Sequence, residues 1–166
     1  MKAFCLTITI AVFFLICLTG LQAQNTQLKL NQVELMKQFT GTWKAETGKD
    51  TTFTIEDKSF GDGHDVYLKT ETKGKTIWEA KTLVGYDKKH DILIETIIEN
   101  ESPEITLFAI RFIAPNKFEE ILLEDISNPE KATEKWTYEL TSPDLHIATY
   151  MKNNKIVSVN TFKRIK

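Results

Sequence analysis

The sequence of 166 residues contains only two cysteines, Cys5 and Cys17, and both lie near its N-terminus. Residues 24–166 therefore have no thiol, which excludes disulfides, cysteine nucleophiles and cysteine-ligated metals from that part of the chain. Basic residues are not in excess either, with 21 Lys and Arg against 23 Asp and Glu. Without a net positive charge, binding to nucleic acid lacks its usual electrostatic driving force.

Catalytic and cofactor motifs are also missing. The sequence has no Gly-x-Ser-x-Gly, no phosphate-binding loop and no dinucleotide-binding fingerprint. Gly61 to Asp65 resembles the start of a calcium loop, but the glutamate that would end such a loop is missing. The histidines His64, His90 and His146 do not have the spacing of a zinc site. We therefore predict no metal, no cofactor and no catalytic residue.

The N-terminal segment has the features of an export signal. Lys2 precedes the mainly apolar stretch Ala3 to Leu18, and the small residue Ala23 follows. These features are typical of a secretory signal peptide, residues 1–23, cleaved before Gln24. An uncleaved membrane anchor is the alternative, but nothing basic or apolar follows the stretch. We expect a periplasmic or secreted protein without a stable membrane span.

The rest of the chain fits one globular domain, because 42% of all residues are hydrophobic and 27% are charged. In the segment 24–40, apolar residues recur at spacings of three and four from Val33 to Phe39. Asn31 is the expected N-cap, and Gly41 is expected to end the helix. A short amphipathic helix is therefore predicted from Asn31 to Phe39, as a plug or lid on the domain that follows.

From Gly41 onward, short β-rich runs alternate with turn residues. The ten predicted strands are 41–47, 51–56, 66–72, 77–86, 92–98, 105–113, 118–126, 132–140, 145–151 and 156–164. Their links are too short for crossover helices, which excludes a parallel sheet, and closure of the sheet removes exposed edges. We predict an all-β fold: an antiparallel up-and-down barrel over residues 41–166, preceded by the short helix.

The residues Phe39-Thr40-Gly41-Thr42-Trp43 join the predicted helix to the first strand. This Gly-x-Trp start resembles that of the calycin superfamily, which includes lipocalins and fatty-acid-binding proteins. Together with the phrase Leu83-Val84-Gly85-Tyr86-Asp87, it is most similar to bacterial secreted lipocalin-like proteins of unknown function. The Arg-x-Tyr pair that holds carboxylates in fatty-acid binders is missing near the C-terminus, so their ligand is not implied.

Three residues are expected to close the barrel at one end. Gly41 lets the chain turn from helix into strand, and Trp43 offers a broad ring. In lipocalins a basic residue of the last strand packs over that tryptophan, and Arg164 occupies the matching place here. Such a cation–π contact contributes roughly 0.5–2 kcal/mol. The resemblance therefore implies structural roles for these residues.

Aromatic side chains in the presumed interior are the candidate ligand-binding residues, since they suit a small apolar or amphipathic molecule. They are Tyr67, Trp78, Tyr86, Phe108, Phe112, Trp136, Tyr138 and Tyr150. Arg111 interrupts an apolar strand and would meet an anionic group if it pointed inward. The same aromatics would otherwise fill the barrel as core. Because the inward face is uncertain by one residue, both interpretations stay open.

Histidines and carboxylates are weaker candidates. His146 would be the axial ligand if the barrel bound haem, although a partly exposed strand histidine is the simpler interpretation. His64 and His90 are expected on surface turns. Carboxylates are plentiful, and any two of them would form an acid–base pair only if they met in an apolar cavity with displaced pKa values. They include Glu95, Glu99, Glu119, Glu120, Glu124 and Asp125.

The sequence thus favours an exported lipocalin-like barrel that binds a small hydrophobic or amphipathic ligand. A filled barrel that acts as a structural or interaction domain is the alternative, and an enzyme or a haem binder ranks below both. A small molecule is the partner class indicated; nucleic acid is not expected, and no oligomeric state is implied.

Overall fold

The computed structural model describes residues 29–165, so the predicted signal peptide lies outside the described residues. Helix α2 (Gln32–Met36) continues as the 3-10 helix η1 (Lys37–Phe39). The strands are β1 (Gly41–Gly48), β2 (Thr51–Phe60), β3 (Gly63–Thr72), β4 (Lys75–Asp87), β5 (Ile92–Glu99), β6 (Ser102–Ala114), β7 (Lys117–Leu122), β8 (Glu134–Ser142), β9 (Leu145–Lys152) and β10 (Lys155–Ile165). The 3-10 helices η2 (Leu123–Ser127) and η3 (Pro129–Lys131) connect β7 to β8.

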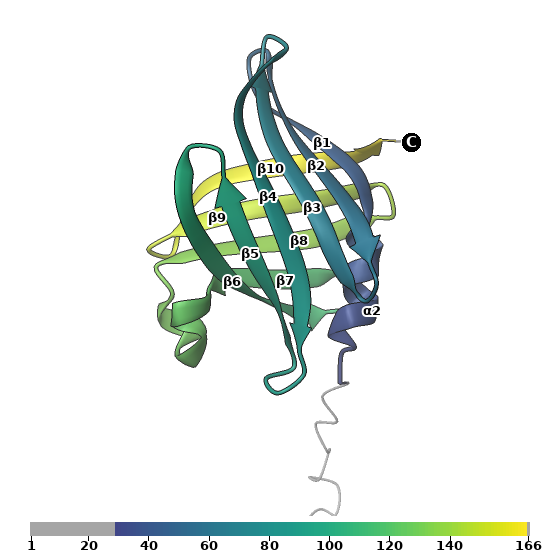
Figure 1. Ribbon diagram of the computed structural model, residues 1–166, viewed down its shortest axis with the longest axis vertical. Helices are drawn as coiled ribbons and strands as arrows, with labels where there is room; N and C mark the ends of the chain where they lie inside the picture. Colours follow the sequence, from purple (N-terminus) through teal and green to yellow (C-terminus); the bar gives the residue numbers. More distant parts are fainter. Residues whose placement is uncertain (1–28, 166) are drawn as a thin grey trace, which may run out of the picture.

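The ten strands form one closed antiparallel barrel. Each strand pairs with its neighbours in sequence, and β1 closes the barrel by pairing with β10. Strands β2 to β6 cross in front of β7 to β10, so that the two halves of the barrel enclose one interior (Figure 1). The predicted up-and-down barrel with a short helix before its first strand is confirmed, and its architecture agrees with a calycin-like fold.

The seventh strand is shorter than predicted. It ends at Leu122, and the following residues form η2 instead of continuing the strand to Ile126. Leu123 and Ile126 both pack on the outside of the barrel, against a cluster that includes Ile121 and Ala132. A helical turn places residues three apart on one side, whereas strand alternation would have sent them to opposite faces.

Helix α2 and η1 lie across one end of the barrel (Figure 1). Asn31 caps the helix as predicted, since its side chain accepts a hydrogen bond of 3.2 Å from the Glu34 amide. Met36 and Phe39 join the core, and the Gln32 side chain bonds the Phe112 amide on β6 at 2.7 Å. The helix is therefore attached to the barrel by both apolar packing and a buried hydrogen bond.

Trp43 and Arg164 connect this end to the last strand. The Trp43 ring is 1% exposed and donates a 2.6 Å hydrogen bond to the Phe39 carbonyl. The Arg164 guanidinium lies 4.0 Å from the ring centroid. It also donates to the carbonyls of Thr40 and Gln38, so the stack expected from the resemblance is present together with hydrogen bonds to the helix–strand link.

Gly41 leaves the space that this arginine needs. Its φ is +127°, and a Cβ atom there would lie 2.7 Å from Nη1 of Arg164. Any larger residue at position 41 would therefore combine a strained backbone with a clash against the guanidinium.

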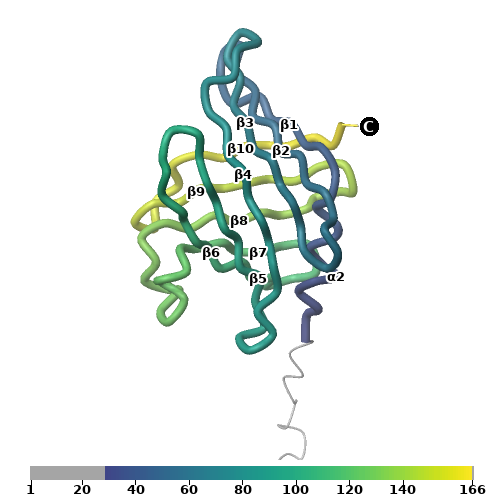
Figure 2. Tube along the Cα trace, viewed as in Figure 1, coloured from purple at the N-terminus to yellow at the C-terminus, as the bar shows by residue number. Residues whose placement is uncertain are grey.

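At the opposite end of the barrel, no helix of the described residues lies across the opening. The β1–β2 and β3–β4 turns extend beyond the rest of the molecule there, and the β5–β6 turn lies beside them (Figure 2). The turns of these two hairpins are linked by a hydrogen bond, because the Lys73 amide donates to the Asp50 carbonyl at 2.8 Å. We call this end the mouth of the barrel.

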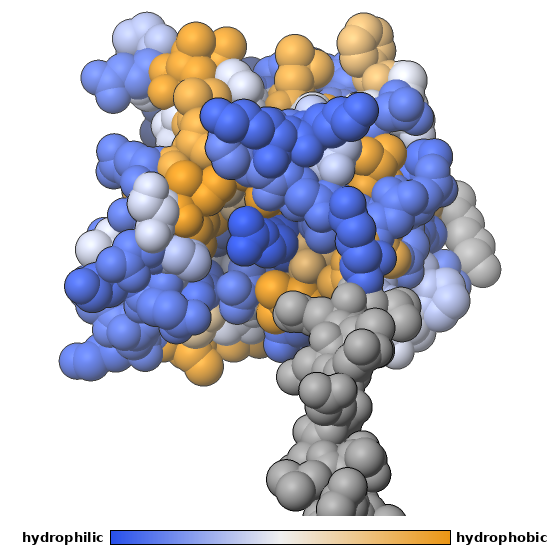
Figure 3. All heavy atoms as spheres, turned by 90° about the horizontal axis from the view of Figure 1, so that it is seen from below, coloured by the Kyte–Doolittle hydropathy of each residue, from blue (hydrophilic) through white to orange (hydrophobic). Residues whose placement is uncertain are grey.

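The surface is mixed in character. Seen from below, hydrophobic residues form several groups that hydrophilic ones separate (Figure 3). Within residues 29–165, no helix has the length and apolar character needed to cross a membrane.

We predict that Arg164→Ala lowers the free energy of unfolding by about 2–4 kcal/mol, because it removes the cation–π contact and several charge-assisted hydrogen bonds. Urea unfolding followed by tryptophan fluorescence measures the change. Lys163→Ala, an exposed neighbour on β10, is the matched control and should change stability by less than about 0.5 kcal/mol. Equal effects of the two substitutions would contradict the structural role of Arg164.

Candidate functional site

The interior of the barrel contains a cavity of about 340 Å³. Its lining combines residues from the helix end, such as Met36 and Phe39, with residues near the mouth, such as Trp78 and Ser158. The volume lies within the range of small-molecule sites, and most of the lining is aromatic or aliphatic. The barrel is therefore hollow between its closed end and its mouth.

Five of the predicted aromatic residues line this cavity: Trp78, Phe108, Trp136, Tyr138 and Tyr150. Three of them form a cluster near the mouth. The rings of Trp136 and Tyr150 are stacked with centroids 4.7 Å apart, and Phe108 meets Trp136 edge-on at 5.4 Å. Such a cluster offers a rigid apolar surface to a ligand that enters there.

The other predicted residues lie elsewhere. Phe112 is buried beneath the helix, where its ring centroid is 6.1 Å from that of Phe39. Tyr67 points outward and donates a hydrogen bond to Glu79, and Tyr86 is 40% exposed and donates to Asp91. These three aromatics therefore leave the candidate site.

Arg111 also lies outside the cavity. Its neighbours Ile110 and Phe112 point inward, so strand alternation turns the arginine outward, where it is exposed and faces Glu119 of β7 in register. The expectation that Arg111 would meet an anionic ligand group depended on an inward orientation. Arg111, the cation that was expected to meet a ligand, therefore does not line the cavity.

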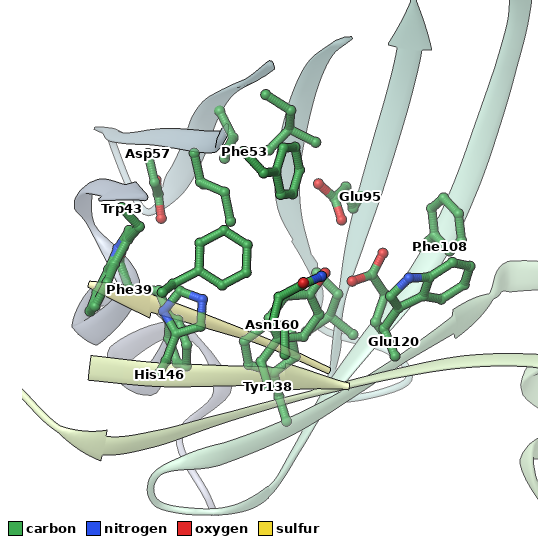
Figure 4. Close-up of a pocket in the computed structure, with 18 of the residues that line it drawn as sticks. Phe39, Trp43, Phe53, Asp57, Glu95, Phe108, Glu120, Tyr138, His146 and Asn160 are labelled. Atoms are coloured by element: carbon green, nitrogen blue, oxygen red, sulfur yellow. The ribbon is translucent and has the colours of Figure 1, made fainter. Parts of the chain in front are cut away.

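Two carboxyl groups lie in the cavity instead. Glu95 on β5 is 8% exposed and Glu120 on β7 is 6% exposed, and β6 separates their strands. The two carboxyl groups point toward one another across the inner face of β6 (Figure 4). The two side chains lie close enough for each to alter the pKa of the other.

Burial is the main reason that this pair is hard to ionise. It raises the pKa of Glu95, and it raises the pKa of Glu120 further, with an added contribution from the charge of Glu95. The hydroxyl of Tyr138 interacts with Glu120 and has a pKa well above its usual value, because of burial and the two nearby carboxyl groups. Burial therefore favours the protonated form of both carboxyl groups, and Tyr138 stays protonated at neutral pH.

His146 lies at the deep end of the cavity and is 1% exposed, not partly exposed as expected. Its ring stacks on Phe162 at 4.7 Å and meets Trp43 edge-on at 4.5 Å. Burial lowers its pKa to about 4, so the imidazole is neutral at physiological pH. Neither ring nitrogen has a hydrogen-bond partner among the described residues.

The other histidines differ from each other. His64, expected on a surface turn, is buried and forms a 2.8 Å contact with Asp57, which lines the cavity. His90 does lie in an exposed turn, where it contacts Asp87. Within residues 29–165, no group of three or more His, Asp or Glu side chains is placed to hold a metal ion.

The sequence contains many acidic residues, and their spacing alone does not select a pair among them. The signal that would have selected Glu95 and Glu120 is their position on the inward face of otherwise apolar strands: Leu93, Glu95 and Ile97 on β5, and Phe118 and Glu120 on β7. A charged residue in an inward apolar series is uncommon unless it has a function.

The buried pair makes stability depend on pH. In the unfolded chain both carboxyl groups have ordinary pKa values near 4.5, whereas in the folded barrel both are raised. The stabilising contribution of the protonated pair is therefore complete at low pH and is lost as the pH rises through the folded-state pKa values.

We predict that Glu120→Gln raises the free energy of unfolding at pH 8 by about 1–3 kcal/mol, because it removes a buried charge.

Urea unfolding between pH 4 and pH 8 measures this effect, and the difference from wild type should vanish toward pH 4. Glu119→Gln is the control, because the Glu119 carboxylate lies on the outer face, 3.7 Å from Lys135. A Glu120→Gln protein that is less stable than wild type at pH 8 would show that the carboxylate is satisfied in the barrel.

A scan against models of known protein families finds no match, and a search of curated proteins finds no significant match either.

Proposed function

We propose that this protein is a binding protein that holds a small, largely apolar molecule inside its barrel. The observation that carries the proposal is the cavity of about 340 Å³, with a closed apolar end and an aromatic mouth. A filled barrel would have packed the same side chains against one another, as the core around Phe112 does. Burial of an apolar molecule against these rings supplies the driving force for binding.

The lining also suits a ligand that is polar at one point. Most of the cavity wall is apolar, but Glu95, Glu120 and the Tyr138 hydroxyl converge on one part of it, and Asn160 of β10 also lines the cavity. A few convergent polar groups in an apolar site fix the orientation of a ligand. The proposed ligand class is therefore amphipathic, with an apolar body and a polar group.

We predict saturable one-to-one binding of the neutral fluorescent probe N-phenyl-1-naphthylamine, measured as a rise in probe emission. Ala148→Phe should weaken binding at least tenfold, because Ala148 lines the cavity and a phenyl ring would occupy the ligand's space. Thr149→Phe is the matched control, because its side chain points to the other side of β9, outside the cavity lining.

Native mass spectrometry of gently purified protein gives a second measurement, because a retained ligand adds a mass that denaturation removes. A probe that does not bind, or that binds Ala148→Phe and wild type equally, would contradict the proposal. The alternative, a filled barrel that serves a protein partner, would then be favoured.

We also propose that the chain is exported and that its first 23 residues are removed. The support is the sequence of that segment, with a basic start, an apolar stretch and Ala23 before Gln24. The full chain is expressed in a bacterium, and the periplasm is separated from the cytoplasm. The protein should be found in the periplasm, with the intact mass of a chain that starts at Gln24. A full-length chain confined to the cytoplasm would contradict export.

A further inference from the structure

The charged groups of the cavity all have the same sign. Asp57, Glu95, Glu99 and Glu120 line it, whereas no Lys or Arg of residues 29–165 does so. Asp57 has His64 as a partner at 2.8 Å, and Glu99 accepts a hydrogen bond of 3.2 Å from Trp78 near the mouth. Among the described residues, the partners of Glu95 and Glu120 are each other and the hydroxyl groups of Thr82 and Tyr138.

A buried carboxyl pair without a basic partner costs free energy that the fold does not recover. Replacement by apolar residues of similar size would be neutral or stabilising in most proteins. Groups that destabilise a fold at a cavity wall are typical of sites that recognise a ligand. A cationic group would be the missing partner of the two carboxyl groups, and a ligand bound in the cavity would supply it.

His146 is an independent indication that the cavity is incomplete without a ligand. It lies on β9, is 1% exposed and lines the same cavity, yet neither of its ring nitrogens has a hydrogen-bond partner among the described residues. A buried polar atom without a partner costs about 1–3 kcal/mol. Tyr138 lies between the two features, because its ring centroid is 6.2 Å from that of His146 and its hydroxyl interacts with Glu120.

We infer that the cavity binds a molecule with an apolar body and a protonated amino group, and that the ammonium group is held between Glu95 and Glu120. This inference rests on the proposed function and adds the charge of the ligand to it. The ammonium donates hydrogen bonds to both carboxyl groups, and the apolar body contacts the rings of Phe108, Trp136 and Tyr138. A carboxylate ligand of the same size binds more weakly, because the pair repels its charge.

Binding is coupled to a proton. Burial favours protonated carboxyl groups in the free cavity, and an ammonium group that favours two carboxylates displaces a bound proton to solvent as the complex forms. The other titratable groups that face the cavity are Asp57, Glu99, Tyr138, His146 and Tyr150. The pKa values of both tyrosines are raised and that of His146 is about 4, so these three stay uncharged between pH 5.5 and pH 8.

We predict that octylammonium binds at least tenfold more tightly than 1-octanol and that octanoate binds more weakly than either, at pH 8 in isothermal titration calorimetry. The three probes share one apolar chain and differ in the charge of the terminal group. The affinity of octylammonium should fall at least threefold between pH 8 and pH 5.5, whereas that of 1-octanol should not change.

Glu95→Gln and Glu120→Gln should each weaken octylammonium at least tenfold and weaken 1-octanol by a much smaller factor, because a glutamine amide still hydrogen-bonds a hydroxyl group but offers no charge to an ammonium group. Glu119→Gln, one residue away on the outer face, should leave both affinities unchanged. If 1-octanol binds but octylammonium is not preferred, or keeps its affinity in both glutamine variants, the inference is overturned while the proposed function stands. If none of the three probes binds, both are overturned.

Discussion

Glu95 and Glu120 are buried side by side, and no Lys or Arg of the described residues lies beside them in the cavity. The rest of the barrel must hold this unfavourable pair in place. Burial raises the pKa of both Glu95 and Glu120, and the charge of Glu95 raises the pKa of Glu120 further, so the folded barrel favours their protonated forms. Their strands are separated by β6, and the closed register of β5, β6 and β7 holds both groups against the cavity. The fold thereby keeps an unfavourable pair in place instead of letting either group reach solvent.

The remaining structure divides into a rigid end and a receptive end. At the closed end, Trp43 lies between the helix and β10 and is covered by Arg164, which also bonds the carbonyls of the helix–strand link. Toward the mouth, Trp78, Trp136 and Tyr150 line the cavity, and no helix in the described part of the chain covers that end. The contacts at the closed end stabilise the fold, so the cavity can retain buried carboxyl groups that lower stability. Such a division is common in binding proteins.

The sequence predicted the barrel because turn residues and strand alternation recur from Gly41 to the C-terminus, and Gly-x-Trp located the helix–strand link. It did not predict which aromatics line the cavity: Tyr67 points outward because its neighbours Val66 and Leu68 point inward, a difference of one residue. The meeting of Glu95 and Glu120 depends on register across three strands, and the end of β7 depends on packing by η2. Neither is visible in local spacing.

We propose that the carboxyl pair of Glu95 and Glu120 holds a proton that a bound cation would replace. A titration of the glutamate side-chain carboxyl carbons by ¹³C nuclear magnetic resonance observes this directly, with Glu95→Gln and Glu120→Gln used for assignment. We expect at least one of the two carboxyl groups to have the chemical shift of a protonated acid at pH 7 and to become ionised when octylammonium is added. Two carboxylates that are both ionised at pH 7 and titrate near pH 4.5 would contradict the account.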